Sequence, residues 1–296
     1  MRYRIEFIFF QLFRFLILLL PLKSAQRFGA FIGTIAYYIA VERRKIALEN
    51  LQYAFPEKSK QDCTKIAKGS FRNFAISLVE LLWFPNLTDD ILRKLIKTNY
   101  LDMLHKNHSK GKGLILLSGH FGNWELIALG IAYLSKLPFN IIVQTQNNKL
   151  VDAVINRHRC LFGNKVVPMG MSVREIIRTL HEKGIVAIAP DQSGDRERGI
   201  YVEFFGRETA THQGPAVFAL RTGAPLIMGF IIRNADCTYE VILEEINYTD
   251  IPSYNEENVY KLTRRHLELL EKYIRQYPDH WLWMHRRWKH TKQREK

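Results

Sequence analysis

The stretch GLILLSGHFGNWELIALGIAYL, residues 113–134, decides how this chain folds. It begins with a short, wholly apolar run, which is typical of a strand buried on both faces of a sheet. Gly119 and Gly122 then permit a sharp turn, and Asn123 suits the N-cap of a helix that carries the second apolar run. The stretch therefore predicts a strand, a tight turn and a helix, which is the repeating unit of an α/β fold.

Short apolar runs alternate with helical patterns as far as residue 246, and a long amphipathic helix follows at about 255–276. This alternation predicts an α/β fold, with a mixed central sheet flanked by helices. The runs predicted as strands cover residues 113–118, 139–144, 165–168, 185–190, 201–205, 225–232 and 239–246. Helices are expected to begin near residues 123, 149, 173 and 211.

The N-terminal region is helical in pattern, and its most apolar part is IEFIFFQLFRFLILLLPL at 5–22. A helix of this length rises about 27 Å, just enough to cross a thin hydrocarbon core. No convincing cleavage site follows it, which disfavours a removed signal peptide. We expect a membrane anchor over residues 1–41, which spans the bilayer or lies in its interface, and a single α/β domain over 42–296. A buried core helix is the alternative.

The charge of the chain restricts its partners. A formal net charge of +14 indicates a polyanionic partner, namely nucleic acid, an anionic membrane or a phosphorylated substrate. The apolar N-terminus and the lack of a nucleic-acid-binding motif disfavour nucleic acid.

Cys63, Cys160 and Cys237 are far apart and form no CxxC pair, which argues against a disulfide framework and against a zinc site.

A histidine is followed by an acid five positions later in three places: His120 and Glu125, His266 and Glu271, and His290 and Glu295. The second pair lies within one regular helix, where five positions of about 100° each put the side chains on different faces. The third lies in a polar tail that no core would hold rigid. The first pair lies at the carboxyl end of a predicted strand, where α/β sheets place their ligands.

The first pair suits acid–base chemistry. His120 would stand just outside the helix and Glu125 in its first turn, where the two side chains can meet. A neutral imidazole can remove the proton of a hydroxyl as it attacks a carbonyl, and a carboxylate on the other ring nitrogen fixes the tautomer. We therefore expect His120 to be a general base and Glu125 its partner. A hydrogen-bonded structural histidine is the alternative.

Other charged and aromatic residues are further candidates for the site. Arg157 and Arg159 would point about 200° apart on one helix, so both reach one phosphate only if the helix has ended or is irregular. We expect at least one of them in the site, and a solvated basic face is the alternative. Asp191 follows a predicted strand at its carboxyl end, where it suits a site residue or a cap. The tryptophans and cations of residues 281–288 suit a membrane interface, stacking on nucleic-acid bases or packing on the core.

The motif GHFGNWE at 119–125 resembles that of the bacterial lipid A late acyltransferases, the secondary lauroyl and myristoyl transferases of lipopolysaccharide assembly. Four more segments resemble the same family in the same order. They are RRKIALENLQYAFPE (43–57), NRHRCLFG (156–163), the block from Ala189 to Ile227, and PDHWLWMHRRW (278–288). The resemblance spans nearly the whole chain and implies a glycerolipid-acyltransferase-like fold.

The resemblance also implies roles for individual residues. His120 would be the general base and Glu125 its partner, with Asn123 positioning the turn. Arg157 and Arg159 would bind phosphate or steady charge near the acyl transfer site. The block that would line the substrate site contributes Asp191, Phe205, Gly206, Thr209, Thr211 and Gly214.

The reaction implied is direct acyl transfer, without a metal, a cofactor or an acyl-enzyme. The donor would be an acyl-acyl carrier protein, and the acceptor a hydroxyl of a Kdo-bearing lipid A precursor. The enzyme would work at the cytoplasmic side of the bacterial inner membrane, on an anionic surface, without nucleic acid. A phosphatidylinositol mannoside or glycerolipid acceptor is one alternative, and a non-catalytic basic membrane-surface protein is another.

Overall fold

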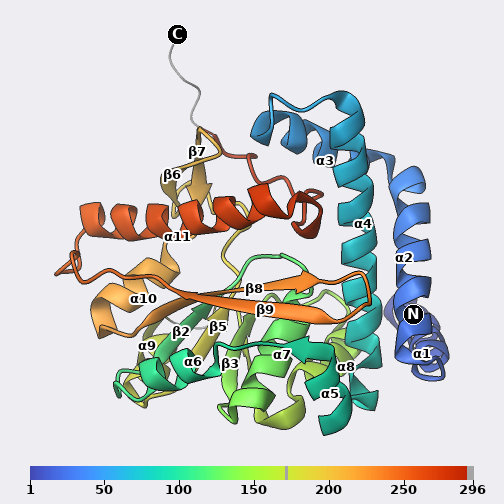
Figure 1. Ribbon diagram of the computed structural model, residues 1–296, viewed down its shortest axis with the longest axis horizontal. Coiled ribbons are helices and arrows are strands. Elements are labelled where there is room, and N and C mark those ends of the chain that lie inside the picture. Colours follow the sequence, from blue (N-terminus) through green and yellow to red (C-terminus); the bar gives the residue numbers. More distant parts are fainter. Residues whose placement is uncertain (171–172, 292–296) are drawn as a thin grey trace.

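A computed structural model describes residues 1–170 and 173–291 of the chain, which form a central sheet covered by helices (Figure 1). The sheet has seven strands in the order β1-β9-β8-β2-β5-β3-β4, and β6 and β7 form a separate hairpin. Every pair in the large sheet is parallel except β8 with β9, so the predicted mixed sheet flanked by helices is confirmed. The strands are β1 (Ile96–Lys97), β2 (Leu114–Leu117), β3 (Phe139–Val143), β4 (Lys165–Pro168), β5 (Ile185–Ile188), β6 (Ile200–Phe204), β7 (Arg207–Thr211), β8 (Leu226–Arg233) and β9 (Tyr239–Glu245).

Each predicted strand corresponds to an observed one, whereas β1 and β7 were not predicted. β1 has only two residues, and β7 reads RETAT, a polar sequence that resembles a loop. The helices are α1 (Arg2–Leu18), α2 (Leu22–Ile39), α3 (Val41–Ala54), α4 (Lys60–Trp83), α5 (Asp89–Leu95), α6 (Leu101–His108), α7 (Trp124–Ser135), α8 (Lys149–Arg159), α9 (Val173–His181), α10 (Gly214–Thr222) and α11 (Glu256–Gln276). Short 3-10 turns lie at Phe84–Asn86, Leu161–Gly163 and Pro278–His280.

The predicted apolar membrane helix is not supported. Among the described residues, no helix combines the length and the apolarity that crossing a bilayer requires. The apolar run is divided at Pro21, which lies between α1 and α2. Proline cannot continue a helix from within, so α1 ends before the run is long enough.

α2 packs closely against α4 through glycines (Figure 1). A Cβ atom added at Gly33 would lie 2.6 Å from the Cα of Arg72, and one added at Gly29 would lie 2.8 Å from the Cα of Ile76. The buried face of α2 consists of Ala25, Gly29 and Gly33 together with Gln26 and Tyr37. Several of its large apolar side chains, such as Phe31, face outward and are exposed.

The register of two central strands positions the site. β2 and β5 are parallel, with Leu117 opposite Ile188 at their carboxyl ends. His120 and Asp191 each lie three residues beyond these paired ends. Because parallel strands end at the same edge of a sheet, the two side chains meet there although they are far apart in the sequence.

Candidate active site

The turn that carries His120 depends on one glycine. Gly122 has φ +58°, a left-handed conformation, and an added Cβ would lie 1.9 Å from the carbonyl oxygen of Ile231. Only glycine fits this conformation and this close approach. The turn is consequently held against β8, and His120 lies at a defined place between β2 and α7.

Asn123 supports the same turn from within the protein. Its side chain accepts a hydrogen bond of 2.9 Å from the backbone N–H of Leu126, so it is the N-cap of α7 as predicted. It also donates a bond of 2.6 Å to Oε2 of Glu80, a buried carboxylate that Tyr239 and Arg233 contact as well. Asn123 has no exposed surface, so it positions the turn and does not line the substrate site directly.

The C-terminal segment closes over the turn from the other side. The backbone N–H of Gly122 donates to the carbonyl of His280 at 2.8 Å, and Leu282 donates to the carbonyl of His120 at 3.0 Å. Trp281 and its two tryptophan neighbours, Trp283 and Trp288, are buried in the core. Of the three alternatives for this aromatic segment, the structure therefore supports packing on the core.

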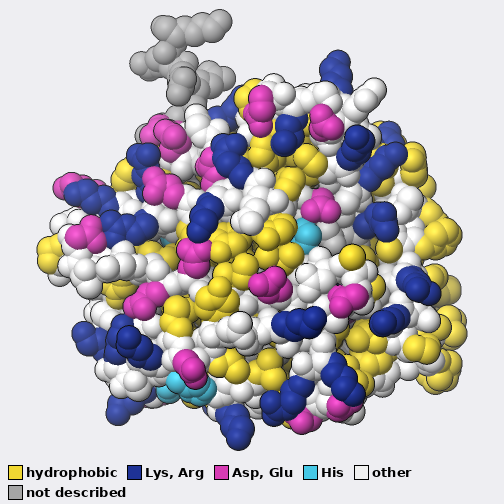
Figure 2. All heavy atoms as spheres, viewed as in Figure 1, with side chains coloured by type: hydrophobic (Ala, Val, Ile, Leu, Met, Phe, Trp, Pro, Cys, Tyr) yellow, Lys and Arg dark blue, Asp and Glu magenta, His cyan; other side chains and the backbone are white. Residues whose placement is uncertain are grey.

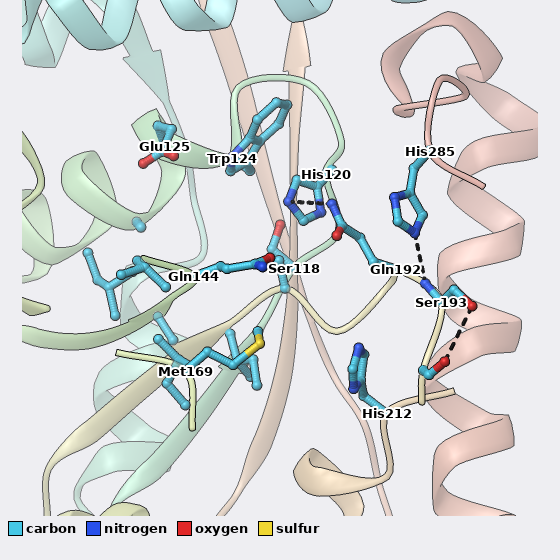
Figure 3. Close-up of a pocket in the computed structure, with 18 of the residues that line it drawn as sticks. Ser118, His120, Trp124, Glu125, Gln144, Met169, Gln192, Ser193, His212 and His285 are labelled. Carbon is cyan, nitrogen blue, oxygen red and sulfur yellow. Dashed lines mark hydrogen bonds between the residues drawn. The ribbon is translucent and has the colours of Figure 1, made fainter. Parts of the chain in front are cut away.

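His120 is paired with Asp191. The ring Nδ1 lies 2.7 Å from Oδ1 of Asp191, and the backbone N–H of His120 donates to Oδ2 at 2.8 Å. Trp281 Nε1 donates to the same Oδ2 at 2.8 Å. The Asp191 side chain is 3% exposed and that of His120 is 21% exposed, so the carboxylate is sealed in while the ring reaches the surface of a cavity (Figure 3).

These contacts determine the proton positions. Burial alone would lower the pKa of His120, but the charge of Asp191 and the hydrogen bond to it outweigh burial and raise this pKa. Burial opposes the Asp191 charge too, yet His120 lowers the pKa of Asp191 to about 2. The carboxylate is therefore ionised, and the neutral ring keeps its proton on Nδ1. The other ring nitrogen of His120, Nε2, carries a lone pair and lies 3.3 Å from the side-chain amide nitrogen of Gln192.

Glu125 does not occupy the position that we expected. Its carboxylate receives two hydrogen bonds from Arg159, from Nε at 2.8 Å and from Nη2 at 2.5 Å. Figure 3 shows Trp124 between Glu125 and His120. We expected Glu125 to contact the ring nitrogen of His120 that does not take the substrate proton. This expectation is wrong, because Asp191 contacts that nitrogen, Nδ1. Both Glu125 and Arg159 still line the cavity.

The two candidate arginines of α8 are separated. Arg159 is directed into the cavity, where Glu125 binds it, and its side chain is 12% exposed. Arg157 is exposed and is not among the residues that line the cavity. The helix continues through both positions, so their separation of about 200° is retained and only one reaches the site.

None of the predicted residues of the later block lines the cavity; Asp191 contacts His120 from behind, and the others lie further back. Thr211 is fully buried, and its hydroxyl accepts a bond of 2.6 Å from Arg287, a buried cation of the C-terminal segment. Thr209 contacts the same guanidinium, and Gly214 begins α10. Phe205 and Gly206, both with positive φ, form the turn between β6 and β7. The block therefore anchors the C-terminal segment over His120.

The cavity beside His120 has a volume of about 800 Å³ and two kinds of lining. Its apolar part is formed by side chains of the sheet, of α7 and of the turn after β4, among them Ile127, Ala128, Ile141, Val143, Met169 and Ala187. Its polar part includes Gln144, Gln192, Ser193, His212, His285 and Lys289 (Figure 3). Such an amphipathic cavity suits a ligand with an apolar chain and a polar, anionic group.

The pair of His266 and Glu271 does not form a site. His266 is buried in α11, while Glu271 accepts from the backbone N–H of Phe205 and pairs with Arg275. Glu295 lies outside the described residues. Residues that the sequence did not single out, such as Gln192 and Ser193, come from the loop after β5, where Ser193 donates a hydrogen bond to His285 of the C-terminal segment.

Comparison with known proteins identifies the family of the chain. The sequence model of a family described as bacterial lipid A biosynthesis acyltransferase matches residues 1–290. A lipid A biosynthesis palmitoleoyltransferase of Escherichia coli (strain K12) is 27% identical over 275 residues, covering 91% of this chain and 86% of the relative. A lipid A biosynthesis lauroyltransferase of the same strain is 25% identical over 93% of this chain and 88% of its own length. A phosphatidylinositol mannoside acyltransferase of Mycolicibacterium smegmatis is 23% identical over 54% of each chain. With matched motifs along almost its whole length, the chain belongs to the bacterial lipid A biosynthesis acyltransferases.

Proposed function

We propose that this acyltransferase moves a fatty acyl group from an acyl-acyl carrier protein to a hydroxyl of a Kdo-bearing lipid A precursor. The observation that carries the proposal is the His120–Asp191 pair, whose second ring nitrogen, Nε2, faces an amphipathic cavity. The apolar lining suits the acyl chain, and the polar lining suits the phosphorylated acceptor. The near full-length matches to lipid A acyltransferases support this acceptor over phosphatidylinositol mannoside, for which the match covers about half of each chain.

The geometry supports a direct transfer. Nε2 of His120 takes the proton of the acceptor hydroxyl as its oxygen attacks the thioester carbonyl, which forms the new C–O bond. The C–S bond then breaks, and the imidazolium returns the proton to the leaving thiolate, so no acyl-enzyme is formed. Asp191 holds the ring in the productive tautomer and stabilises its protonated form. Glu125 fixes the guanidinium of Arg159 beside the reacting groups.

Mass spectrometry of products tests the function. The purified enzyme is incubated with acyl-carrier proteins that bear different chains, together with a lipid A precursor or a phosphatidylinositol mannoside. We expect the mass of the lipid A precursor to increase by one acyl group. Acylation of the mannoside alone would replace the proposed acceptor, and acylation of neither would refute the proposal.

We also propose that α1 and α2 hold the enzyme on the cytoplasmic face of the inner membrane, lying in the interface. Most of the large apolar side chains that are exposed in the described structure belong to residues 1–41, including Phe9, Phe15 and Phe31. Figure 2 shows hydrophobic atoms gathered along the edge where Figure 1 places α1 and α2. A patch of this kind marks a lipid or protein contact, and the net charge of +14 favours an anionic bilayer.

Replacing Phe9, Phe15 and Phe31 together with serine should release the enzyme from vesicles. Each phenylalanine that leaves an apolar environment costs about 1.5 kcal/mol or more, so we expect vesicle affinity to fall at least about 10²-fold. Flotation with vesicles containing anionic lipid measures this loss. The control is Tyr254→Ser, which removes an exposed aromatic ring far along the chain. Unchanged flotation of the triple variant would contradict the proposed docking.

A further inference from the structure

Three cations from distant parts of the sequence line one part of the cavity. Arg43 comes from α3, whereas Arg286 and Lys289 come from the C-terminal segment. The two segments are in contact, because Nη1 of Arg43 lies 3.4 Å from the carbonyl oxygen of Met284. We call Arg43, Arg286 and Lys289 the basic rim. The tertiary fold therefore creates a positive region that neither segment forms alone.

Most of the charge of the basic rim is not neutralised. Arg286 pairs with Glu42 at 2.6 Å, but within the described part of the chain no carboxylate lies within ion-pair distance of Arg43 or Lys289. The cavity also contains two carboxylates. Glu125 is occupied by Arg159, and Asp195 accepts hydrogen bonds from two backbone N–H groups of its own loop. Asp195 keeps its negative charge, but among the described residues it forms no ion pair with Arg43 or Lys289. These two cations therefore line the cavity without an ion-pair partner, and an anion beside them would be favoured.

The basic rim lies close to the reacting groups. His285, which precedes Arg286, accepts a hydrogen bond of 3.1 Å at Nε2 from the backbone N–H of Ser193. The neighbouring Gln192 contacts Nε2 of His120. Burial lowers the pKa of His285 to about 4, so this ring is neutral at pH 7 and the positive charge comes from the rim. His285, Ser193 and Gln192 thus connect the rim to Nε2 of His120.

We propose that the basic rim is a binding subsite for a phosphate ester, with Arg43 and Lys289 as its main ligands. Ammonium and guanidinium groups that converge on one place match the charge and the oxygens of a phosphate. The inference rests on the proposed function, which supplies two sources for the ligand. One is a phosphate on the acceptor headgroup, and the other is the phosphodiester that links the donor's prosthetic arm to its carrier protein. The Arg159 site, by contrast, is already filled by Glu125.

Steady-state kinetics of R43Q, K289Q and the double variant test the subsite. Hydrogen bonds to charged groups are the stronger ones, so we expect the double variant to raise one KM by at least about tenfold while kcat changes little. With the acceptor as the source, the KM for the phosphorylated acceptor rises and that for an acceptor stripped of phosphate does not. With the donor as the source, the KM for the acyl-carrier protein rises instead. The charge-matched control is K106Q with K112Q, because both lysines are exposed and neither lines the cavity.

A binding measurement separates this inference from the proposed function. Calorimetry with inorganic pyrophosphate requires no turnover, and we expect wild-type protein to bind it more tightly than the double variant. If the enzyme transfers no acyl group but this difference is found, the proposed function fails and the subsite stands. Unchanged KM values together with equal pyrophosphate binding would overturn the subsite, as would equal KM increases for phosphorylated and stripped acceptors.

Discussion

His120→Ala should lower kcat by about 10²–10⁴-fold, because the acceptor hydroxyl loses the base that removes its proton. Substrate binding should change little, since the ring is one small part of a cavity of about 800 Å³. The Gly122 turn and the N-cap at Asn123 do not depend on the imidazole, so the variant should fold. Product formation under saturating substrates measures the effect, and circular dichroism checks the fold.

His181→Ala is the matched control for this experiment. His181 is an exposed histidine at the end of α9 and does not line the cavity. Its replacement should leave kcat unchanged. If His120→Ala keeps more than about a tenth of the wild-type rate, the alternative of a structural histidine is correct and the mechanism is wrong.

Asp191→Asn should reduce kcat nearly as much as the loss of the ring itself. Oδ2 of Asp191 accepts from two N–H donors, those of His120 and Trp281, so the asparagine oxygen must take that place. The amide NH₂ then faces Nδ1 and forces the imidazole proton onto Nε2. Nε2 would then carry a proton and could not accept one from the acceptor hydroxyl. In a serine protease triad, the same replacement of aspartate by asparagine lowers kcat about 10⁴-fold.

The pH profile distinguishes Asp191 from Glu125 as the partner of His120. Only the neutral ring acts as a base, so the rate should rise with pH through the pKa of His120, which lies above its ordinary value of about 6.5. Removing the Asp191 charge lowers this pKa, and the acid limb should therefore move to lower pH in Asp191→Asn. For Asp191→Asn we therefore expect a lower maximal rate at high pH together with an acid limb at lower pH.

Glu125→Gln is the comparison that decides the matter. It breaks the ion pair with Arg159 but leaves both contacts between Asp191 and His120 in place. We expect a smaller loss, about 10–10²-fold, because a partly buried guanidinium loses its partner. The acid limb should move less than in Asp191→Asn. A larger shift in Glu125→Gln would restore Glu125 as the partner of His120.

Local patterns were sufficient to predict most elements of this fold, with β1 and β7 as exceptions. The apolar run at 114–117, the glycines of the turn and the N-cap Asn123 act over a few residues, so each can be recognised from its neighbours. The same is true of the strands β3, β4, β5, β8 and β9 and of the long helices. His120 was identified for this reason, since it lies where a strand ends and a helix begins.

Contacts between distant segments could not be predicted in this way. Asp191 meets His120 because β2 and β5 are neighbours in the sheet with Leu117 opposite Ile188, and strand order and register depend on packing across the whole domain. Glu125 was favoured because it is near in sequence, yet Arg159 from α8 binds it. The basic rim likewise joins α3 to the C-terminal segment.

The N-terminal region illustrates the same division. Its composition alone established that residues 1–41 carry many apolar side chains in helical patterns. Whether these side chains would be buried, exposed or part of a bilayer-spanning helix depended on the break at Pro21 and on the close packing of Gly29 and Gly33 against α4. Short-range periodicity thus determined which segments are helices and strands, whereas only three-dimensional packing decided which side chains meet, because that packing joins residues that the sequence keeps far apart.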